Sequence, residues 1–375
     1  MPGALDGLRI VEFAGIGPGP FTGMMLADHG AEVIRIDRPG ASFGPAALAR
    51  SRRSIALDLK QPEGVAVARA LCGTADGLIE GYRPGVMERL GLGPDALLAD
   101  NPKLVYGRMT GWGQHGPLAD LPGHDINYIA VAGVLEGIGR PGAPPVAPVN
   151  YVGDFGGGGM LLAFGMVAAL LAVRRGAAGQ VVDAAMTDGA ALLAAMSWGF
   201  RGAGMWRDGA GANLLSGAAP FYRSYGCSDG RFVAVGAIEP PFYAALLDGL
   251  GLAGDSDFAQ QMDVARWPAQ SARLETIFAT RSRDEWAEAF AGTQACVSPV
   301  LTMGEAAAHP HNRARGTFDE VGGSIEPAPA PRLSGTPAAA PTSPGAVGAD
   351  TDAVLGALGY DDEKLAALRA SGAIQ

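Results

Sequence analysis

Cysteine and histidine are both scarce in this chain. Its 375 residues include three cysteines, Cys72, Cys227 and Cys296, and five histidines. Three widely spaced cysteines suit neither a disulfide framework nor a zinc site, so the sequence predicts no structural metal and a reducing compartment. The first residues, Met1–Asp6, lack the basic and apolar regions of a signal peptide, and the last residues match no targeting address. We therefore expect a cytoplasmic protein.

Positive charge is also in short supply. Charged residues make up 18% of the chain, and the formal net charge is −10. A general nucleic-acid-binding protein needs a basic surface to neutralise phosphates, so this charge argues against that class. Hydrophobic residues make up 48%. Together with the length, this predicts a soluble globular protein with enough core for two domains.

Long hydrophobic runs are absent except for one, from residue 156 to residue 173, which carries no charge. Its length is at the lower limit for a membrane-spanning helix, which needs about 20 apolar residues. The run starts with four glycines, ends at Arg174 and Arg175, and has no second counterpart. We therefore predict a buried core helix rather than a membrane span.

Apolar runs of strand length alternate with helical patterns through the first half of the chain. The predicted strands are residues 7–14, 31–37, 54–59, 77–82, 104–110 and 180–185. Helices are predicted at residues 21–29 and 62–72, in a short segment ending near 90, and along the apolar run. Strands that alternate with helices form a parallel sheet with helical crossovers. The sequence therefore predicts a Rossmann-like α/β large domain over residues 1–190.

A different pattern begins near residue 217. Two strand-like segments, 219–225 and 231–236, flank Asp229–Gly230, which predicts a β-hairpin. Predicted helices at 242–250, 272–280 and 283–291 and a strand at 297–301 follow. We expect a linker at 191–216, a smaller α+β domain at 217–310 and a returning linker at 311–346. A final amphipathic helix is predicted at 361–370.

The glycine-rich turn after the first predicted strand raises the hypothesis of a dinucleotide-binding site. Gly15, Gly17 and the later acidic residue Asp37 match the Rossmann nucleotide pattern. However, Pro20 stands where the third glycine belongs, and Pro18 also intrudes. Proline has no amide N–H to donate to a pyrophosphate. The sequence therefore favours a Rossmann-like scaffold with a ligand other than NAD(P) or FAD.

Three segments place an ionisable side chain near glycine: Gly123–Asp125 with His124, Gly153–Gly159 with Asp154, and Gly236–Pro241 with Glu239. Glycine lets the backbone approach a ligand closely, and these side chains can exchange protons. Each has a structural alternative. His124 could be a capping or core residue of a helix predicted at 125–138, Asp154 could be a helix N-cap, and Glu239 could pair with an arginine.

Two helix starts that each carry an acid–base group favour function over these alternatives. Both can direct backbone N–H groups at a single anion. Basic residues near strand ends suggest a second part of the site, a phosphate-rich ligand bound at one edge of the sheet. The alternative for each is scattered surface charge. They are Arg38, Arg50, Arg52, Arg53, Lys60, Arg83 and Arg89.

Six motifs in order along nearly the whole chain resemble those of the family III coenzyme A transferases, the CaiB/BaiF superfamily. They are Glu80–Gly91, Gly111–Gln114, Gly123–Tyr128, Gly153–Gly158, Gly179–Ala184 and Val235–Pro240. The first motif is typical of the whole superfamily. The motifs around His124 and Glu239 are similar to those of its α-methylacyl-CoA racemase branch.

The resemblance implies an isomerase that interconverts (R)- and (S)-2-methylacyl-CoA thioesters through an enolate. It implies that His124 and Asp154 exchange the α-proton on opposite faces, and that Glu239 orients His124. Coenzyme A would be part of the substrate, with no separate cofactor and no metal. The implied coenzyme A and thioester contacts are Arg38, Leu57, Lys60, Gly81, Tyr82, Arg83, Arg89, Gly123 and Asp125.

The resemblance also implies a homodimer of interlocked chains. Residues 330–375 would complete the large domain, which would face the small domain and Glu239 of the partner. The main alternative is coenzyme A transfer, in which Asp154 attacks the thioester and forms an anhydride. That route needs neither His124 nor Glu239 as a base. A coenzyme A-binding protein without catalysis would leave all three groups idle.

Overall fold

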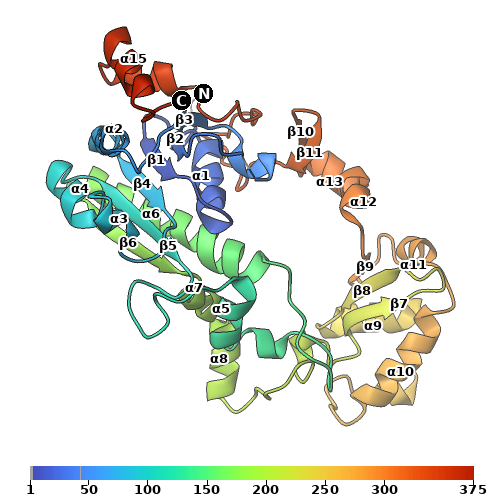
Figure 1. The fold of residues 1–375 in the computed structure, drawn as a ribbon. Helices are drawn as coiled ribbons and strands as arrows, with labels where there is room; N and C mark the ends of the chain where they lie inside the picture. Colours follow the sequence, from blue (N-terminus) through green and yellow to red (C-terminus); the bar gives the residue numbers. More distant parts are fainter. Residues whose placement is uncertain (1–2, 43) are drawn as a thin grey trace. The chain divides into compact units, whose positions relative to one another are not determined.

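A computed structural model describes residues 3–42 and 44–375 (Figure 1). The chain divides into two compact units. The large unit consists of Met1–Ala132, Pro148–Ala194 and Arg315–Gln375, and the small unit of Gly133–Ala147 and Ala195–Ala314. Residues 133–147, which fall inside the predicted large domain, thus belong to the small unit. Most of the predicted linker at 191–216 also belongs to it.

The large unit is built on a six-stranded sheet in which all neighbouring strands are parallel. This confirms the predicted α/β class. Its strands are β1 (Arg9–Phe13), β2 (Glu32–Asp37), β3 (Arg53–Ala56), β4 (Gly77–Glu80), β5 (Val105–Thr110) and β6 (Gln180–Ala185). The order β3-β2-β1-β4-β5-β6 changes direction between β1 and β4. At such a switch point the carboxyl ends of the strands leave a crevice for a ligand.

Helices cover both faces of this sheet because successive strand residues point to opposite sides. On β1, Val11 joins the core on one face and Ile10 the core on the other. The first face packs against α2 (Pro62–Gly73), α4 (Pro94–Asp100), α14 (Thr351–Ala357) and α15 (Asp362–Ala370). The second packs against α1 (Pro18–Asp28), α5 (Asp125–Val131) and α6 (Leu161–Arg174).

The long apolar segment starts earlier than predicted. Tyr151–Met160 form a π-helix, η3, which continues directly into α6. The N-cap is Asn150, so the alternative that Asp154 is a helix N-cap is excluded. Asp154 instead lies in the first turn of η3. Four consecutive glycines fall inside this helix, and their poor helix propensity explains why a later start was expected.

The glycines of η3 serve close helix packing. A Cβ atom on Gly157 would lie 2.7 Å from the backbone N of Ala190 in α7 (Met186–Leu193). A Cβ atom on Gly189 of α7 would lie 1.8 Å from the carbonyl oxygen of Gly157. On the α1 side, a Cβ atom on Gly159 would lie 2.9 Å from the Pro18 carbonyl oxygen. These three glycines therefore allow neighbouring helices to pack closely. Gly157 and Gly159 do not line the cavity that contains Asp154.

By length and composition alone, the helical segment Tyr151–Arg174 could cross a membrane, and among the described residues it is the one helix that could. Core helices of soluble proteins pass the same test, so a single such helix is weak evidence. Leu162 and Met166 are fully buried against the sheet, beside Val105 of β5. The opposite face is exposed, for example at Phe164 and Leu171, so the predicted burial holds for one face of the helix.

The small unit contains a three-stranded antiparallel sheet. Its strands are β7 (Tyr222–Gly226), β8 (Phe232–Gly236) and β9 (Val297–Pro299). The hairpin between β7 and β8 turns at Asp229–Gly230, as predicted, with Gly230 at φ +74°. The helix α8 (Ala195–Gly202) precedes this hairpin. The helices after it are α9 (Pro240–Gly249), α10 (Trp267–Phe278), α11 (Arg283–Ala289) and α12 (Met303–Ala308).

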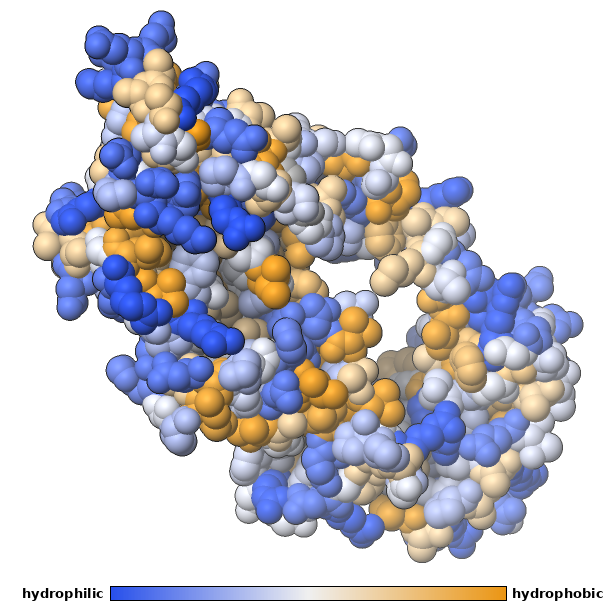
Figure 2. Space-filling model, viewed as in Figure 1, coloured by the Kyte–Doolittle hydropathy of each residue, from blue (hydrophilic) through white to orange (hydrophobic). Residues whose placement is uncertain are grey.

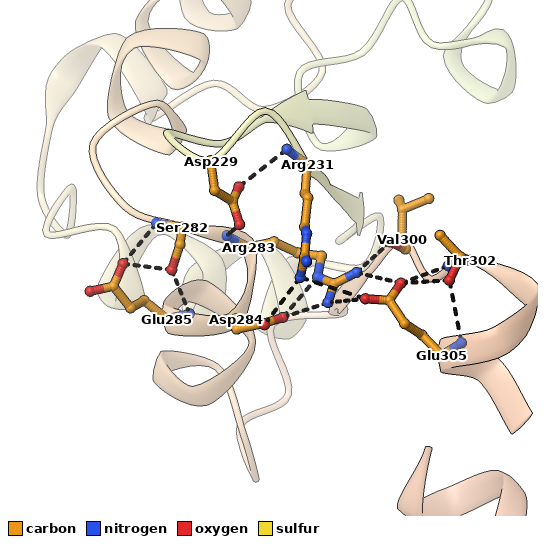
Figure 3. A network of polar contacts seen from close by, with 9 residues as sticks. All are labelled: Asp229, Arg231, Ser282, Arg283, Asp284, Glu285, Val300, Thr302 and Glu305. Atoms are coloured by element: carbon orange, nitrogen blue, oxygen red, sulfur yellow. Dashed lines mark hydrogen bonds and ion pairs between the residues drawn. The ribbon is translucent and has the colours of Figure 1, made fainter. Parts of the chain in front are cut away.

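An ion-pair network joins α11 to α12 in the small unit (Figure 3). The buried Arg283 guanidinium binds both carboxylate oxygens of Glu305, at 2.8 and 2.9 Å, and also donates to the Val300 carbonyl oxygen. The Arg283 bond, with further bonds from Thr302, lowers the pKa of Glu305 to about 2. Asp229 accepts from the Arg283 backbone N–H, so the network also includes the β7–β8 turn.

Two sequence predictions fail in the connecting regions. The helix predicted at 125–138 ends at Val131, and Gly133 adopts φ +75° just beyond it. The predicted linker at 311–346 contains α13 (Pro310–Arg315) and a hairpin of β10 (Phe318–Val321) and β11 (Ser324–Pro327). Farther on, Ile374 forms an antiparallel bridge with Leu57, and both residues are buried in the core beside β3.

Candidate active site

Two adjacent cavities of the large unit open at the switch point between β1 and β4. One, of about 630 Å³, is lined by His124 and Asp154, and we call it the acid–base cavity. The other, of about 510 Å³, is lined by Arg38 and Lys60, and we call it the basic cavity. Gly15 and Ile16 after β1 and Tyr82 after β4 line both cavities. A single extended ligand can therefore occupy both.

His124 enters the acid–base cavity from the start of α5. It is the N-cap residue of this helix, and its backbone N–H donates to Asn127 Oδ1 at 3.0 Å. The Tyr128 hydroxyl donates to the carbonyl oxygen of the preceding Gly123, and the Tyr128 ring packs edge-on against Trp112, with centroids 4.8 Å apart. The backbone of His124 is thus fixed from both sides. Its ring is exposed.

Asp154 is held by three neighbours in the same cavity. Asn150 Nδ2 donates to Asp154 Oδ2 at 2.9 Å, and the Asp154 backbone N–H donates to Asp125 Oδ2 at 2.7 Å. A Cβ atom on Gly17, the N-cap of α1 at φ +65°, would lie 3.1 Å from Asp154 Oδ2. Position 17 therefore requires glycine both for its backbone conformation and for the close approach of the carboxylate.

The environment of Asp154 favours its protonated form. Burial raises the pKa of the Asp154 carboxyl, and the negative charge of Asp125 adds to the increase. The hydrogen bond from Asn150 and the charge of His124 oppose it, but the pKa stays above the ordinary value. A carboxyl whose pKa moves toward neutrality is better suited to accept and donate a proton in turn.

The basic cavity contains two cations, Arg38 and Lys60, and the carboxylates of Asp37 and Asp58 also line it. Neither Arg38 nor Lys60 forms an ion pair with another described residue. Leu57 and Tyr82 supply apolar surface between them. The loop after Arg38 is anchored by the last residue of the chain, because the Gly40 N–H donates to Gln375 Oε1 at 2.9 Å. Guanidinium and ammonium groups on an apolar wall can bind phosphates beside a ring system.

The other predicted ligand contacts divide into two groups. Gly81, Tyr82, Arg83 and Gly123 line the acid–base cavity. Arg89 is exposed on α3 (Val86–Arg89) and is absent from the described lining of both cavities. Asp125 is buried behind Asp154 and does not line them either. Its carboxylate faces the η3 backbone. A contact of the ligand with the backbone N–H groups near Asp125 stays a prediction.

Arg50, Arg52 and Arg53 are not part of a phosphate site. Arg50 and Arg52 precede β3 and Arg53 is its first residue, so they lie at the end of the strand opposite to its carboxyl end. Arg38 and Lys60 follow their strands. Each arginine is already paired with carboxylates. Arg50 binds Asp28 at 2.6 Å and Glu326 at 3.3 Å, Arg52 binds the buried Glu12, and Arg53 binds Glu32 at 3.0 Å.

Two positioning residues were missed from the sequence. Glu80, at the end of β4, is buried and accepts hydrogen bonds from the Tyr82 backbone N–H at 2.8 Å and from Arg108 Nε at 2.9 Å. It thereby shapes the loop that lines both cavities. Asn150 lies four residues before Asp154, a spacing that puts two side chains on one helix face. A predicted helix start at Tyr151 would have indicated the contact between Asn150 and Asp154.

Glu239 belongs to the small unit, where it is the exposed N-cap residue of α9. Its proposed pairing with His124 therefore stays a prediction. No group of three or more histidine, cysteine, aspartate or glutamate side chains that could hold a metal ion occurs in the described part of the chain.

A parallel sheet with ionisable groups and basic side chains at its switch point is typical of α/β proteins that bind a ligand at this edge. The chain belongs to CoA-transferase family III, whose family model matches residues 5–351.

Two curated relatives in this family match almost the whole chain. The chain is 48% identical to the mouse protein named alpha-methylacyl-CoA racemase, over 99% of this chain and 97% of the mouse protein. It is 45% identical to the human protein of the same name, over 99% and 98%. The crystal structure of a CAIB/BAIF family protein from Brucella suis superposes with a TM-score of 0.83 at 27% identity, covering 96% of this chain and 100% of that one.

Proposed function

We propose that this chain is an isomerase that interconverts (R)- and (S)-2-methylacyl-CoA thioesters. The observation that carries the proposal is the identity of 45–48%, over 99% of the chain, to two relatives named alpha-methylacyl-CoA racemase. The acid–base cavity supports it independently, because it holds two groups that can exchange a proton, His124 and Asp154. The coenzyme A moiety enters as part of the substrate, and the proposed chemistry uses no further cofactor.

The reaction proceeds by proton exchange at the α-carbon. One of the pair His124 and Asp154 removes the α-proton, and the other returns a proton to the opposite face of the planar enolate. Backbone N–H groups in the first turn of α5, next to His124, donate to the thioester oxygen and stabilise the enolate charge. The raised pKa of Asp154 supports its part, because the group must act as base in one direction and as acid in the other.

The basic cavity binds the coenzyme A moiety. Arg38 and Lys60 contact its phosphates, while Leu57 and Tyr82 pack against its adenine or pantetheine part. Since Gly15, Ile16 and Tyr82 line both cavities, the pantetheine chain passes over them and delivers the thioester to His124 and Asp154. Exchange of Lys60 for alanine raises KM with a smaller effect on kcat, because the contact is the same in ground and transition states.

The active form is a homodimer, in which Glu239 of the small unit hydrogen-bonds the imidazole of the partner's large unit. Large apolar side chains are exposed on the helices of the large unit, and such patches mark association surfaces (Figure 2). Among them are Phe164 at 74% exposure, Leu192 at 63%, Leu193 at 57% and Leu171 at 50%. An interlocked dimer would cover this surface.

Incubation of the enzyme with one epimer of a 2-methylacyl-CoA in deuterated water tests the proposed reaction. We expect epimerisation together with incorporation of deuterium at the α-carbon, both lost in His124→Ala. Coenzyme A transfer is the alternative, because the family includes transferases and Asp154 could act as a nucleophile. Transfer of coenzyme A to an added carboxylate, with Asp154 trapped by hydroxylamine and no α-deuterium, would replace the racemase proposal.

A further inference from the structure

The side chain of Asp125 connects the helices that carry the two proton-transferring groups. Asp125 follows His124 in the chain and begins α5, while its carboxylate lies against η3. Asp125 Oδ2 accepts the Asp154 backbone N–H at 2.7 Å. A Cβ atom on Gly153 would lie only 2.5 Å from Oδ2, so the carboxylate is in direct contact with the η3 backbone.

The second oxygen of this carboxylate has no partner. Asp125 is 6% exposed, and Oδ1 is buried without a hydrogen bond among the described residues. Burying a carboxylate without a cation or a full set of hydrogen-bond donors lowers the stability of the folded state. Buried carboxylates with a structural role in this chain are paired with a cation. Asp28, for example, binds Arg50 through both oxygens, at 2.6 and 3.0 Å. A purely structural role does not explain the choice of an acid at position 125.

We propose that Asp125 is a positioning residue for the proton exchange, which holds Asp154 at a fixed place relative to His124 and supplies a fixed negative charge behind it. The proposal rests on the proposed function above. The hydrogen bond sets the position of Asp154, because Asp125 follows His124 in the chain and accepts the Asp154 backbone N–H. The charge favours retention of a proton by the acid–base pair, which each turnover in either direction requires.

The charged and titratable groups around Asp154 are few, so a change in its pKa can be attributed to Asp125. Arg83 and the Tyr82 phenol, both from the β4 loop, line the same cavity. The His124 imidazole and the Tyr128 phenol from α5 also line it. From α1 the cavity receives only the uncharged Gly17, Pro18, Gly19 and Pro20, and from α7 it receives Met186. Asp125 is thus the acidic group next to Asp154, and it acts from behind, where no ligand displaces it.

Two substitutions separate the hydrogen bond from the charge. Asp125→Asn keeps an oxygen that can accept from the Asp154 N–H but removes the charge, whereas Asp125→Ala removes both. In Asp125→Asn we expect the limb of the pH–rate profile that reports Asp154 to move to lower pH in both reaction directions. In Asp125→Ala we expect kcat to fall by about a hundredfold with KM little changed, because the base is misplaced.

Asp120→Asn is the matched control. It removes the same charge from an exposed position next to Leu121 of the cavity lining, and it should leave the pH profile in place. An unchanged profile in Asp125→Asn, or full activity in Asp125→Ala, would overturn the proposal. An equal shift in Asp120→Asn would also overturn it, since the effect would then be general surface charge.

A measurement without substrate keeps this test separate from the proposed function. Carbon-13 NMR of the protein with labelled aspartate carboxyls follows Asp154, whose signal is identified by its loss in Asp154→Asn. Its titration should move to lower pH in Asp125→Asn. If the wild type fails to exchange α-protons but this titration shifts, the proposed reaction is wrong and the coupling stands. An unshifted titration in an active enzyme refutes the coupling alone.

Discussion

Asp154 destabilises the folded large unit at neutral pH, according to the direction of its pKa shift. Burial, as the largest cause, raises its pKa above the ordinary value of 3.8. Between the pKa of the unfolded chain and that of the folded protein, the folded state binds more protons. The free energy of unfolding therefore decreases as pH rises through this window, and the loss persists above it.

Asp154→Asn removes this pH-dependent penalty. The asparagine oxygen can still accept from Asn150 Nδ2, so the site geometry is kept. We expect a higher Tm than the wild type at pH 7, no difference at a pH below both pKa values, and loss of α-proton exchange. Thermal unfolding across a pH series measures this. A variant less stable than the wild type at pH 7 would contradict it, and Asp120→Asn is the exposed control.

The three thiols differ in accessibility and therefore in reactivity. Burial raises the pKa of Cys72 to about 12, and Cys227 is also buried with a raised pKa. Cys296 is exposed. Since the thiolate is the nucleophile, iodoacetamide should modify Cys296 first and Cys72 only on unfolding. Peptide mass spectrometry of the folded protein over time checks this order, and early labelling of Cys72 would show that its part of the core opens readily.

At the level of elements, the contact between η3 and α7 depends on glycine at the crossing. In Gly189→Ala the new methyl group would meet the Gly157 carbonyl, a backbone atom that no rotamer change can move. The two helices must separate, and overpacking of this kind costs about 1–3 kcal/mol. We expect a lower Tm and reduced activity, because η3 also carries Asp154.

Gly73→Ala provides the matched control for this substitution. Gly73 is the last residue of α2, and a Cβ atom there would meet no atom within 4 Å. Alanine in a helix is slightly stabilising relative to glycine, so the Tm should stay equal or rise. Equal effects of the two substitutions would show that the η3–α7 contact is looser than its geometry indicates.

Local sequence patterns predicted the helices and strands. They could not predict contacts between residues that lie far apart in the sequence. The strand at 180–185 was predicted with the bounds of β6, since a short apolar run between turn signals is a local feature. The start of η3 was missed because the glycines that favour helix crossing also look unfavourable for a helix. Arg50 was assigned to a phosphate site because Glu326, one of its partners, lies 276 positions away, and no local pattern indicates such a pair.

The same limit applies to the candidate site. His124 and Asp154 were predicted from glycine-flanked segments and from a family resemblance, and both line one cavity. The role of Asp125 depends on a contact between α5 and η3 that spacing alone does not specify. Glu239 belongs to the other unit, and no local sequence pattern indicates which group its carboxylate contacts.

For the whole molecule, the proposed dimer predicts complementation between two impaired variants. If His124 and Glu239 of one active site come from different chains, a mixed dimer of His124→Ala and Glu239→Ala contains one intact site and one doubly altered site. Random pairing in co-expressing cells then restores about one quarter of the sites. The exchange rate of the mixture is compared with that of each variant alone. No gain in confirmed mixed dimers would place both residues in one chain.

The bridge between Leu57 and Ile374 has a consequence for how the protein is made. The core beside β1, β2 and β3 includes Val354, Leu355, Leu365 and Ile374, so it cannot be complete before these residues leave the ribosome. The small unit is encoded almost entirely between Ala195 and Ala314 and can close earlier. Complete packing of β1, β2 and β3 therefore waits for residues that are synthesised much later. Until these residues are made, this face of the sheet and the edge next to β3 stay exposed in the nascent chain and need protection by chaperones.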